Sequence, residues 1–240
     1  MNSHTDFILS PMTRILEDVV TAIAGIGNGI ETYPIYDYVM QTLFLKMTGF
    51  QEQKMKCVCW ELATYDYEYR YEKYSKKTIG ECSNYNDKKD IYKDLIKQIQ
   101  KSVANFDVST YLDREEILRE TFTFLKDTFG KTNLSVWAQN SFIEFVNDRT
   151  LIRPTYFGSN DNLFENTLQN LYKQLYSHRN RCAHNTLSYQ QNLPTLKTLV
   201  HDDYKHDNYF VRFSLLILID KIFIRLYNKY LEENENRLYR

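Results

Sequence analysis

Apolar residues recur every three to four positions along most of the chain, which is the spacing of one face of an α-helix. The first such stretch runs through Ile15–Ile23, and Ser10-Pro11 before it is typical of a helix start. Glycines at positions 25, 27 and 29 indicate where this helix ends. A second helix is expected over Pro34–Gly49.

The next segment, from about Gln51 to Tyr74, ends in a run in which tyrosine alternates with polar residues. Taken alone, that period of two predicts a strand. The helical alternative places the tyrosines on two sides of a helix that packs on both. The preceding stretch, 54–63, consists largely of good helix formers, so we prefer the helix. Packing is also the preferred role of these rings over the stacking of unpaired bases.

Downstream of the tyrosines, loops are expected at 76–86 and 153–161, and the sequence Asn192-Leu193-Pro194 breaks the chain again. Helices are expected at 87–103, at 113–130 with Asp113 as its cap, at 135–147, around 168–175, after Ser177, and at 207–233. The connector Asn105–Leu112 is the best candidate boundary. It divides the chain into an N-terminal helical region, 1–105, and a helical bundle, 106–240.

Composition supports a helical fold. The chain has only 7 Gly and 4 Pro in 240 residues, whereas sheet-rich folds need more turn residues than that. The 20 Tyr and 14 Phe predict a bulky aromatic core together with some exposed rings. The fold class that follows is all-α.

Charge and cysteine content limit the functions that can be considered. The net charge is −1, so a nucleic-acid ligand would have to be held by a local basic cluster rather than by bulk attraction. The four cysteines fit neither a zinc pattern nor a disulfide framework, and we expect reduced thiols in a cytoplasmic protein. The apolar stretch Phe213–Leu226 contains three charged residues, which predicts a core helix and no membrane contact.

One decapeptide carries candidate chemistry: Tyr176-Ser177-His178-Arg179-Asn180-Arg181-Cys182-Ala183-His184-Asn185. An Arg and a His stand five positions apart, with Asn after the Arg and Ala before the His, between two amphipathic segments. This arrangement resembles the Arg-x4-His motif of the HEPN superfamily, small all-helical proteins many of which cut RNA without a metal. The resemblance covers roughly Asp113 to Glu233. It implies a HEPN-like bundle with additional N-terminal helices.

The resemblance also implies an endoribonuclease of the kind found in toxin–antitoxin and phage-defence systems. Carried over by position, Arg179, Asn180 and His184 would be catalytic, and His178 and Arg181 would add RNA contacts. Thr186 stands where a variant of the motif has Tyr two residues after the His, so regulation through such a Tyr is not expected.

The residue types suit RNA cleavage by its own 2′-hydroxyl. Histidine can move protons near neutral pH, and the arginine fork can donate two hydrogen bonds to a phosphate. The expected products are a 2′,3′-cyclic phosphate and a 5′-hydroxyl, with no metal and no cofactor. One motif supplies one His, so two proton transfers would call for two chains, as in a symmetric dimer or higher homo-oligomer.

The spacing constrains the geometry of the motif. Residues five apart on a straight helix are about 140° apart around its axis, so Arg179 and His184 do not share a face. We expect Ser177 to cap a short helix, which would place Arg179 in a first turn where free N–H groups also favour a phosphate.

Other interpretations remain open. Arg179 and His184 could form hydrogen bonds at a helix start, and His178 and Arg181 could be solvated neighbours. His201 and His206 fit a charged surface loop better than a metal site. The whole chain could be a non-catalytic HEPN-like module that binds a partner protein or a nucleotide ligand, or a structural helical adaptor. The RNA target, tRNA among the candidates, and a controlling antitoxin or sensor protein are not identified by the sequence.

Overall fold

The computed structural model describes residues 3–27, 29–76, 82–130, 132–148, 150–184 and 208–238. Over these residues the fold is all-α, as predicted, and the β-type pairing found among them is the isolated bridge between Phe157 and Phe164. The helices are α1 (Ser3–Leu9), α2 (Thr13–Ile23), α3 (Tyr33–Tyr65), α4 (Tyr67–Tyr71), α5 (Tyr85–Gln100), α6 (Val108–Tyr111), α7 (Arg114–Phe129), α8 (Asn133–Trp137), α9 (Gln139–Asn147), α10 (Asn166–His184) and α13 (Tyr209–Leu238), with short 3-10 or π turns at Ile30–Thr32, Glu72–Lys76 and Pro154–Tyr156.

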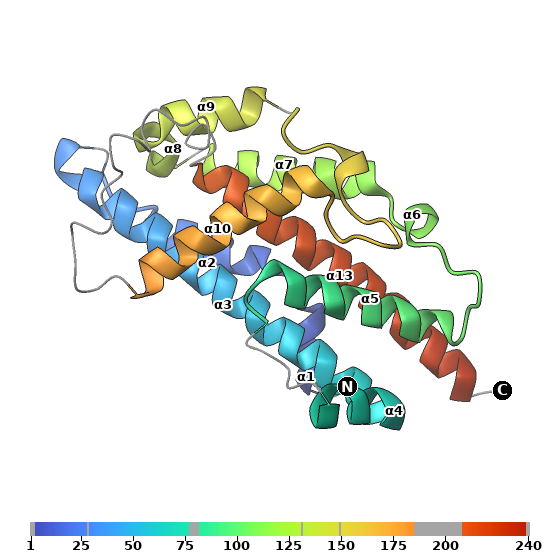
Figure 1. Ribbon diagram of the computed structural model, residues 1–240. Helices are drawn as coiled ribbons and strands as arrows, with labels where there is room; N and C mark the ends of the chain where they lie inside the picture. The colour runs from blue at the N-terminus through green and yellow to red at the C-terminus, as the bar shows by residue number, and fades with distance from the viewer. Residues whose placement is uncertain are drawn as a thin grey trace.

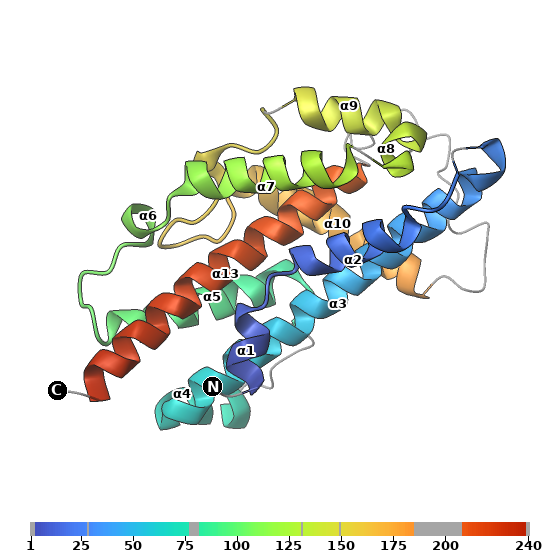
Figure 2. The ribbon, with the colours of Figure 1, turned by 180° about the vertical axis from the view of Figure 1, so that it is seen from behind.

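The two longest helices, α3 and α13, run side by side and organise the molecule. Helices α5 and α10 pack on them on the face seen in Figure 1. Helices α1 and α2 lie on the face seen in Figure 2, where α7 packs along α13. One continuous set of buried apolar residues extends from Ile8 in α1 to Tyr230 in α13. The proposed division at residue 105 stays a prediction, although helices from both sides of it contribute to this core.

Helix α13 is buried around most of its circumference. Every residue from Phe210 to Asp220 is buried, which is the pattern of a core helix. The interpretation of Phe213–Leu226 as a core helix is therefore confirmed. Among the described residues, no helix is both long enough and apolar enough to cross a membrane.

A buried ion pair joins the central helices. Lys54 Nζ of α3 lies 2.5 Å from Asp220 Oδ1 of α13, and both side chains are almost fully buried. Lys54 also donates to the carbonyl of Ser10 at 2.6 Å, and Asp220 accepts from the backbone N–H of Met12 at 2.8 Å. Because both charges have several partners, the desolvation cost is offset and the turn between α1 and α2 is fixed to the core.

Two predicted helix ends are wrong. Helix α3 does not stop at Gly49 but continues to Tyr65. A single interior glycine costs about 1 kcal/mol, and the buried side chains of Met47 and Met55 on either side outweigh it. Ser10 does not cap α2 either. Its hydroxyl donates to the carbonyl of Phe7 at 2.8 Å and so closes α1.

The tyrosine run is helical, as preferred, but it does not pack on two sides. Asp66 interrupts the helix and its carboxylate caps α4 by accepting from the N–H of Tyr69 at 3.0 Å. Only one tyrosine of the run, Tyr69, is buried, so the expectation of packing is wrong for the others. The exposed rings at this end of the molecule belong to Trp60, Tyr65, Tyr67, Tyr71 and Tyr74.

Candidate functional site

The motif lies within a single continuous helix. Helix α10 runs from Asn166 to His184 without a break at Ser177, so the expected short helix capped by Ser177 is wrong. Buried Leu168, Leu171 and Leu175 hold the helix along the core, and an exposed serine in its interior does not interrupt it. Arg179 therefore lies near the C-terminal end of a helix, where cations are favoured, and far from the free N–H groups of a helix start.

Arg179 is held at both of its terminal nitrogens. Its Nη2 lies 3.2 Å from Oε1 and 3.3 Å from Oε2 of Glu52 in α3, and its Nη1 donates to Oδ1 of Asn180 at 3.1 Å. The Arg179 side chain is 22% exposed and that of Glu52 11% exposed. The guanidinium group is thus fixed in position, and part of the Arg179 side chain still faces solvent.

A buried lysine lies behind this pair. Lys88 of α5 is 1% exposed, and its ammonium group donates to the carbonyls of Cys82 at 2.6 Å and Ser83 at 3.0 Å. Burial lowers the pKa of Lys88 to about 8, the carboxylate of Glu52 acts to raise it, and Arg179 acts to lower it. The charges of Glu52 and Asp87 thus act on Lys88 against that of Arg179, and Arg179 itself is paired with Glu52.

Tyr176 of α10 lies beside Asn180 and within the field of Arg179. The hydroxyl of Tyr176 accepts a hydrogen bond from Ser83 Oγ at 3.4 Å. Hydrogen bonds with Ser83 and Asn180 lower the pKa of Tyr176, and the nearby charge of Arg179 acts in the same direction. On the helical wheel of α10, Tyr176 and Asn180 lie between the directions of Arg179 and His184. The arc between the two predicted catalytic residues therefore holds these two polar side chains, together with Ala183.

The predicted site residues divide into two groups. Arg179 and Asn180 belong to the cluster with Glu52, Lys88 and Tyr176, which we call the arginine cluster. The backbone of His184 ends α10, one helical turn after Asn180, and its side chain lies outside the described residues. Position alone puts Asn180 and His184 on one face of the helix, as the sequence predicts.

His178 and Arg181 lie outside the arginine cluster. The Nε2 atom of His178 lies 3.0 Å from the hydroxyl of Tyr209 and 3.4 Å from Sγ of Cys182, and its ring packs against Phe44. Burial lowers the pKa of His178 to about 3, and the positive charges of Arg212 and Arg181 act in the same direction. At neutral pH this ring is uncharged, so it is a poor ligand for phosphate. Arg181 is exposed.

Neither a metal site nor the cavity described below coincides with the motif in the part of the chain that the structure describes. In the part of the chain that the structure describes, no group of three or more His, Cys, Asp or Glu side chains could hold a metal ion. His201 and His206 fall outside that part.

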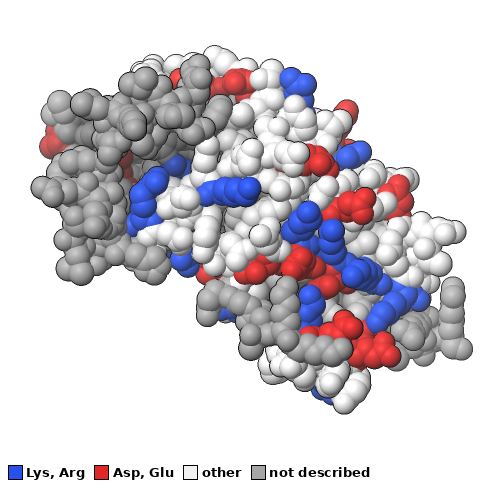
Figure 3. All heavy atoms as spheres, in the orientation of Figure 1, with Lys and Arg blue, Asp and Glu red and all other residues white. Residues whose placement is uncertain are grey.

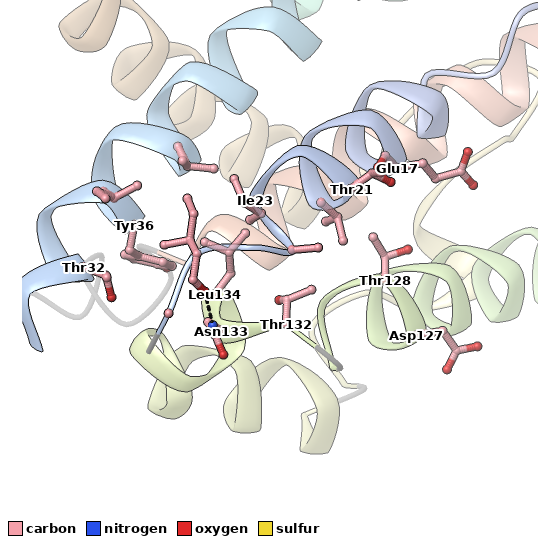
Figure 4. Close-up of a pocket in the computed structure, with 16 residues that line it drawn as sticks. Glu17, Thr21, Ile23, Thr32, Tyr36, Asp127, Thr128, Thr132, Asn133 and Leu134 are labelled. Carbon is pink, nitrogen blue, oxygen red and sulfur yellow. Dashed lines mark hydrogen bonds between the residues drawn. The ribbon is translucent and has the colours of Figure 1, made fainter. Parts of the chain in front are cut away.

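A cavity of about 430 Å³ lies between α2, α3, α7 and α8, where Asn133 donates to the carbonyl of Ile26 at 2.6 Å (Figure 4). It contains none of the motif residues.

Glu52 and Lys88 are the site residues that sequence reasoning missed, and a signal for both was present. Glu52 stands three residues before Met55 on the buried face of α3, and Lys88 stands three residues before Ile91 on the apolar stripe of α5. A charged residue at a core position of a helix is rare unless it is paired.

Comparisons of the chain with family models, with curated proteins and with solved structures find no match.

Proposed function

We propose that the protein is a HEPN-like, metal-independent endoribonuclease that uses Arg179, Asn180 and His184. The observation that carries the proposal is the position of Arg179, which is held between Glu52 and Asn180 while its side chain stays partly exposed. The net charge of the chain is −1, so a phosphate must be attracted locally, and this cluster is a suitable place.

In the proposed reaction, a base removes the proton of the RNA 2′-hydroxyl. The 2′-oxygen then forms a bond to phosphorus, and the bond between phosphorus and the 5′-oxygen breaks. An acid gives a proton to that leaving oxygen, so the products are a 2′,3′-cyclic phosphate and a 5′-hydroxyl. His184 supplies one of these proton transfers, and Arg179 neutralises charge on the pentavalent phosphorus.

Neighbouring residues would position these groups. Asn180 holds Arg179 and lies on the same helical face as His184, and Tyr176 adds a hydroxyl between them. A second histidine from another copy of the chain would serve the second proton transfer, which makes a homodimer or higher homo-oligomer the working form. RNA is the substrate, with tRNA among the candidates, and an antitoxin or sensor protein is the expected means of control.

The test is cleavage of total RNA and purified tRNA by the pure protein in excess EDTA, beside His184→Ala and Arg179→Ala. Cleavage that survives EDTA, leaves cyclic-phosphate ends and disappears in both variants is the expected result. His4→Ala is the matched control, because His4 is a partly exposed histidine paired with Glu61, far along the chain from the motif. Its activity should equal that of the wild type. Cleavage that persists in His184→Ala would refute the proposal.

A second candidate function is a non-catalytic module that binds a partner protein. The feature that favours it is the group of exposed rings around Tyr65, Tyr67 and Tyr71, because exposed aromatic residues are enriched at protein interfaces. Absence of cleavage by a folded wild type across several RNAs would favour this candidate. Loss of partner binding in Tyr67→Ser/Tyr71→Ser, with folding unchanged, would then identify the surface.

A further inference from the structure

Helix α5 carries a row of lysines at a constant spacing. Lys89, Lys93 and Lys97 follow one another every four residues, and Lys101 continues the row at the C-cap. Each step advances about 6 Å along the helix axis and turns about 40° around it. The first three lysines therefore share one face of the helix. The whole row extends over roughly 18 Å.

The lysine row faces away from the core. The opposite side of α5 buries Ile91, Leu95 and Ile99, which follow the same helical spacing. Figure 3 shows Lys and Arg side chains gathered over α5 on the face that Figure 1 presents, with acidic side chains beside them. This face of α5 is thus a surface on which a second molecule could lie.

The charges of the row are available. Within the described part of the chain, the ammonium groups of Lys89, Lys93 and Lys97 form no ion pair, whereas Lys101 is paired with Asp66. Helix α5 also carries three aspartates, Asp87, Asp90 and Asp94. Asp94 binds Lys73 at 2.6 Å, and Asp87 accepts from Asn84 at 2.8 Å. None of the three lysines is held by these aspartates in an ion pair within the described residues, so their ammonium groups can still meet a phosphate.

The row begins beside the candidate site. Ser83, two residues before α5, donates from its hydroxyl to that of Tyr176 in α10 at 3.4 Å, so the end of α5 that carries Lys89 adjoins the arginine cluster. Helix α5 then leads away from α10 (Figure 1), so a row of residues along α5 extends away from the arginine cluster. A chain molecule with one group at Arg179 would place its following groups along this row.

We propose that Lys89, Lys93 and Lys97 form a track for the phosphate backbone of a single-stranded RNA, whose reacting phosphate lies at Arg179. The inference rests on the proposed ribonuclease function. The 6 Å step of the row is comparable to the spacing of neighbouring phosphates along an extended RNA strand. Lysine ammonium groups contact phosphates without reading bases, so the track sets the direction of the strand and not its sequence.

The experiment measures binding rather than cleavage, with a fluorescein-labelled oligouridylate and the His184→Ala chain at several KCl concentrations. Adding Lys89→Gln, Lys93→Gln and Lys97→Gln together should weaken binding about 10- to 100-fold at 0.1 M salt. It should also reduce the slope of log Kd against log salt concentration by about 2, because each lost contact with a single strand removes about 0.7.

The matched control is Lys46→Gln, Arg119→Gln and Lys126→Gln in the same background. All three residues are exposed and lie on α3 or α7. Their substitution removes the same number of positive charges as the lysine-row variant, but at positions outside α5. The control variant should change the Kd for the oligouridylate by less than about twofold, because its three lost charges make no direct contact with the RNA phosphates. A loss as large as that of the lysine-row variant would overturn the inference, because net charge alone would then explain the binding.

Polyglutamate of matched length serves as the competing ligand. If it binds through the row and the oligouridylate does not, the row is a surface for an acidic protein and the inference fails. Binding of neither polymer, or RNA binding that ignores the row, also overturns it. Cleavage by the wild type is measured separately. If the lysine row binds RNA but the wild type cuts none, the proposed ribonuclease function is refuted, whereas the inference that the row binds an RNA strand is retained.

Discussion

Arg179 and Glu52 form an ion pair that is intermediate between a surface pair and a buried one. Their side chains are 22% and 11% exposed, so the interaction should be stronger than a fully solvated pair. We expect Arg179→Ala and Glu52→Ala, with their double variant, to give a coupling free energy of about 1–2 kcal/mol in urea unfolding.

The control for this measurement is the pair Lys229 and Glu233, which is similarly exposed but lies along one helix, α13. It should give no more than about 0.5 kcal/mol. A coupling of that size for Arg179 and Glu52 as well would contradict the view that Glu52 fixes the arginine.

Lys88 should leave a signature in the pH dependence of stability. Its pKa is about 8 in the folded chain against the ordinary 10.5. Between these values the unfolded chain keeps the proton and the folded chain releases it, so the contribution of Lys88 to stability rises with pH. The free energy of unfolding of the wild type minus that of Lys88→Met should increase by about 1.5 kcal/mol from pH 8 to 9.5.

The comparison must be made as a difference between the two proteins. Burial raises the pKa of Cys57 and Cys182, and such groups lower stability as pH rises because the unfolded chain loses the proton first. These contributions are common to both proteins and cancel. A difference that is constant from pH 8 to 9.5 would mean that the Lys88 ammonium is solvated.

At the residue scale, the sequence predicts part of the candidate site. A local motif puts Arg179, Asn180 and His184 on neighbouring turns, and the structure keeps Arg179 and Asn180 in contact. Glu52 and Lys88 come from helices far away in sequence, and only tertiary packing brings them to Arg179. Their positions on apolar stripes indicate burial but do not indicate which charge each one meets.

At the scale of helices, two capping predictions have opposite outcomes. The carboxylate of Asp113 accepts from the N–H of Glu116 at 2.8 Å and caps α7, as predicted. Ser177 lies exposed inside α10 and caps nothing. We expect Asp113→Ala to lower the free energy of unfolding by about 1 kcal/mol and Ser177→Ala to change it by less than about 0.5 kcal/mol.

Thermal or urea unfolding of the two variants is the measurement. Equal losses in both would show that α10 has a helix start at Ser177 in solution. The motif would then have the first-turn geometry that the sequence suggested.

The differences between predicted and observed helices have a common cause. Asp113 is followed by a full amphipathic helix, so the local signal and the packing agree. At Gly49 the local signal favours an end, but buried apolar residues continue on both sides and the helix passes through. At Ser177 the buried residues Leu171 and Leu175 lie before the serine, and the half-buried His178 and Cys182 keep the next turn against the protein. Local propensities of about 1 kcal/mol decide a helix end only where burial does not oppose them.

At the scale of the whole molecule, the candidate site depends on both halves of the chain. Glu52 and Lys88 come from the region before residue 105, whereas Arg179 and Asn180 come from the region after it. The sequence predicts the all-α class from its periodicity and its few glycines and prolines. It does not predict that α3 and α13 lie side by side, because the Lys54–Asp220 pair and the shared core join residues more than 160 positions apart.

The assembly that the reaction requires can be tested by mixing subunits. If each reaction needs His184 from two chains, only pairs of wild-type subunits cut RNA. Wild-type protein is mixed with an equal amount of His184→Ala and left to exchange subunits. At equal total protein, the mixture should then have about one quarter of the wild-type activity, because random pairing makes that fraction of the dimers fully wild type. If each chain works alone, about one half remains. His4→Ala, mixed in the same way, should cause no loss. If the cleavage activity instead falls linearly with the fraction of His184→Ala, the two-histidine mechanism is contradicted. His184 would still be required for catalysis if pure His184→Ala cuts no RNA.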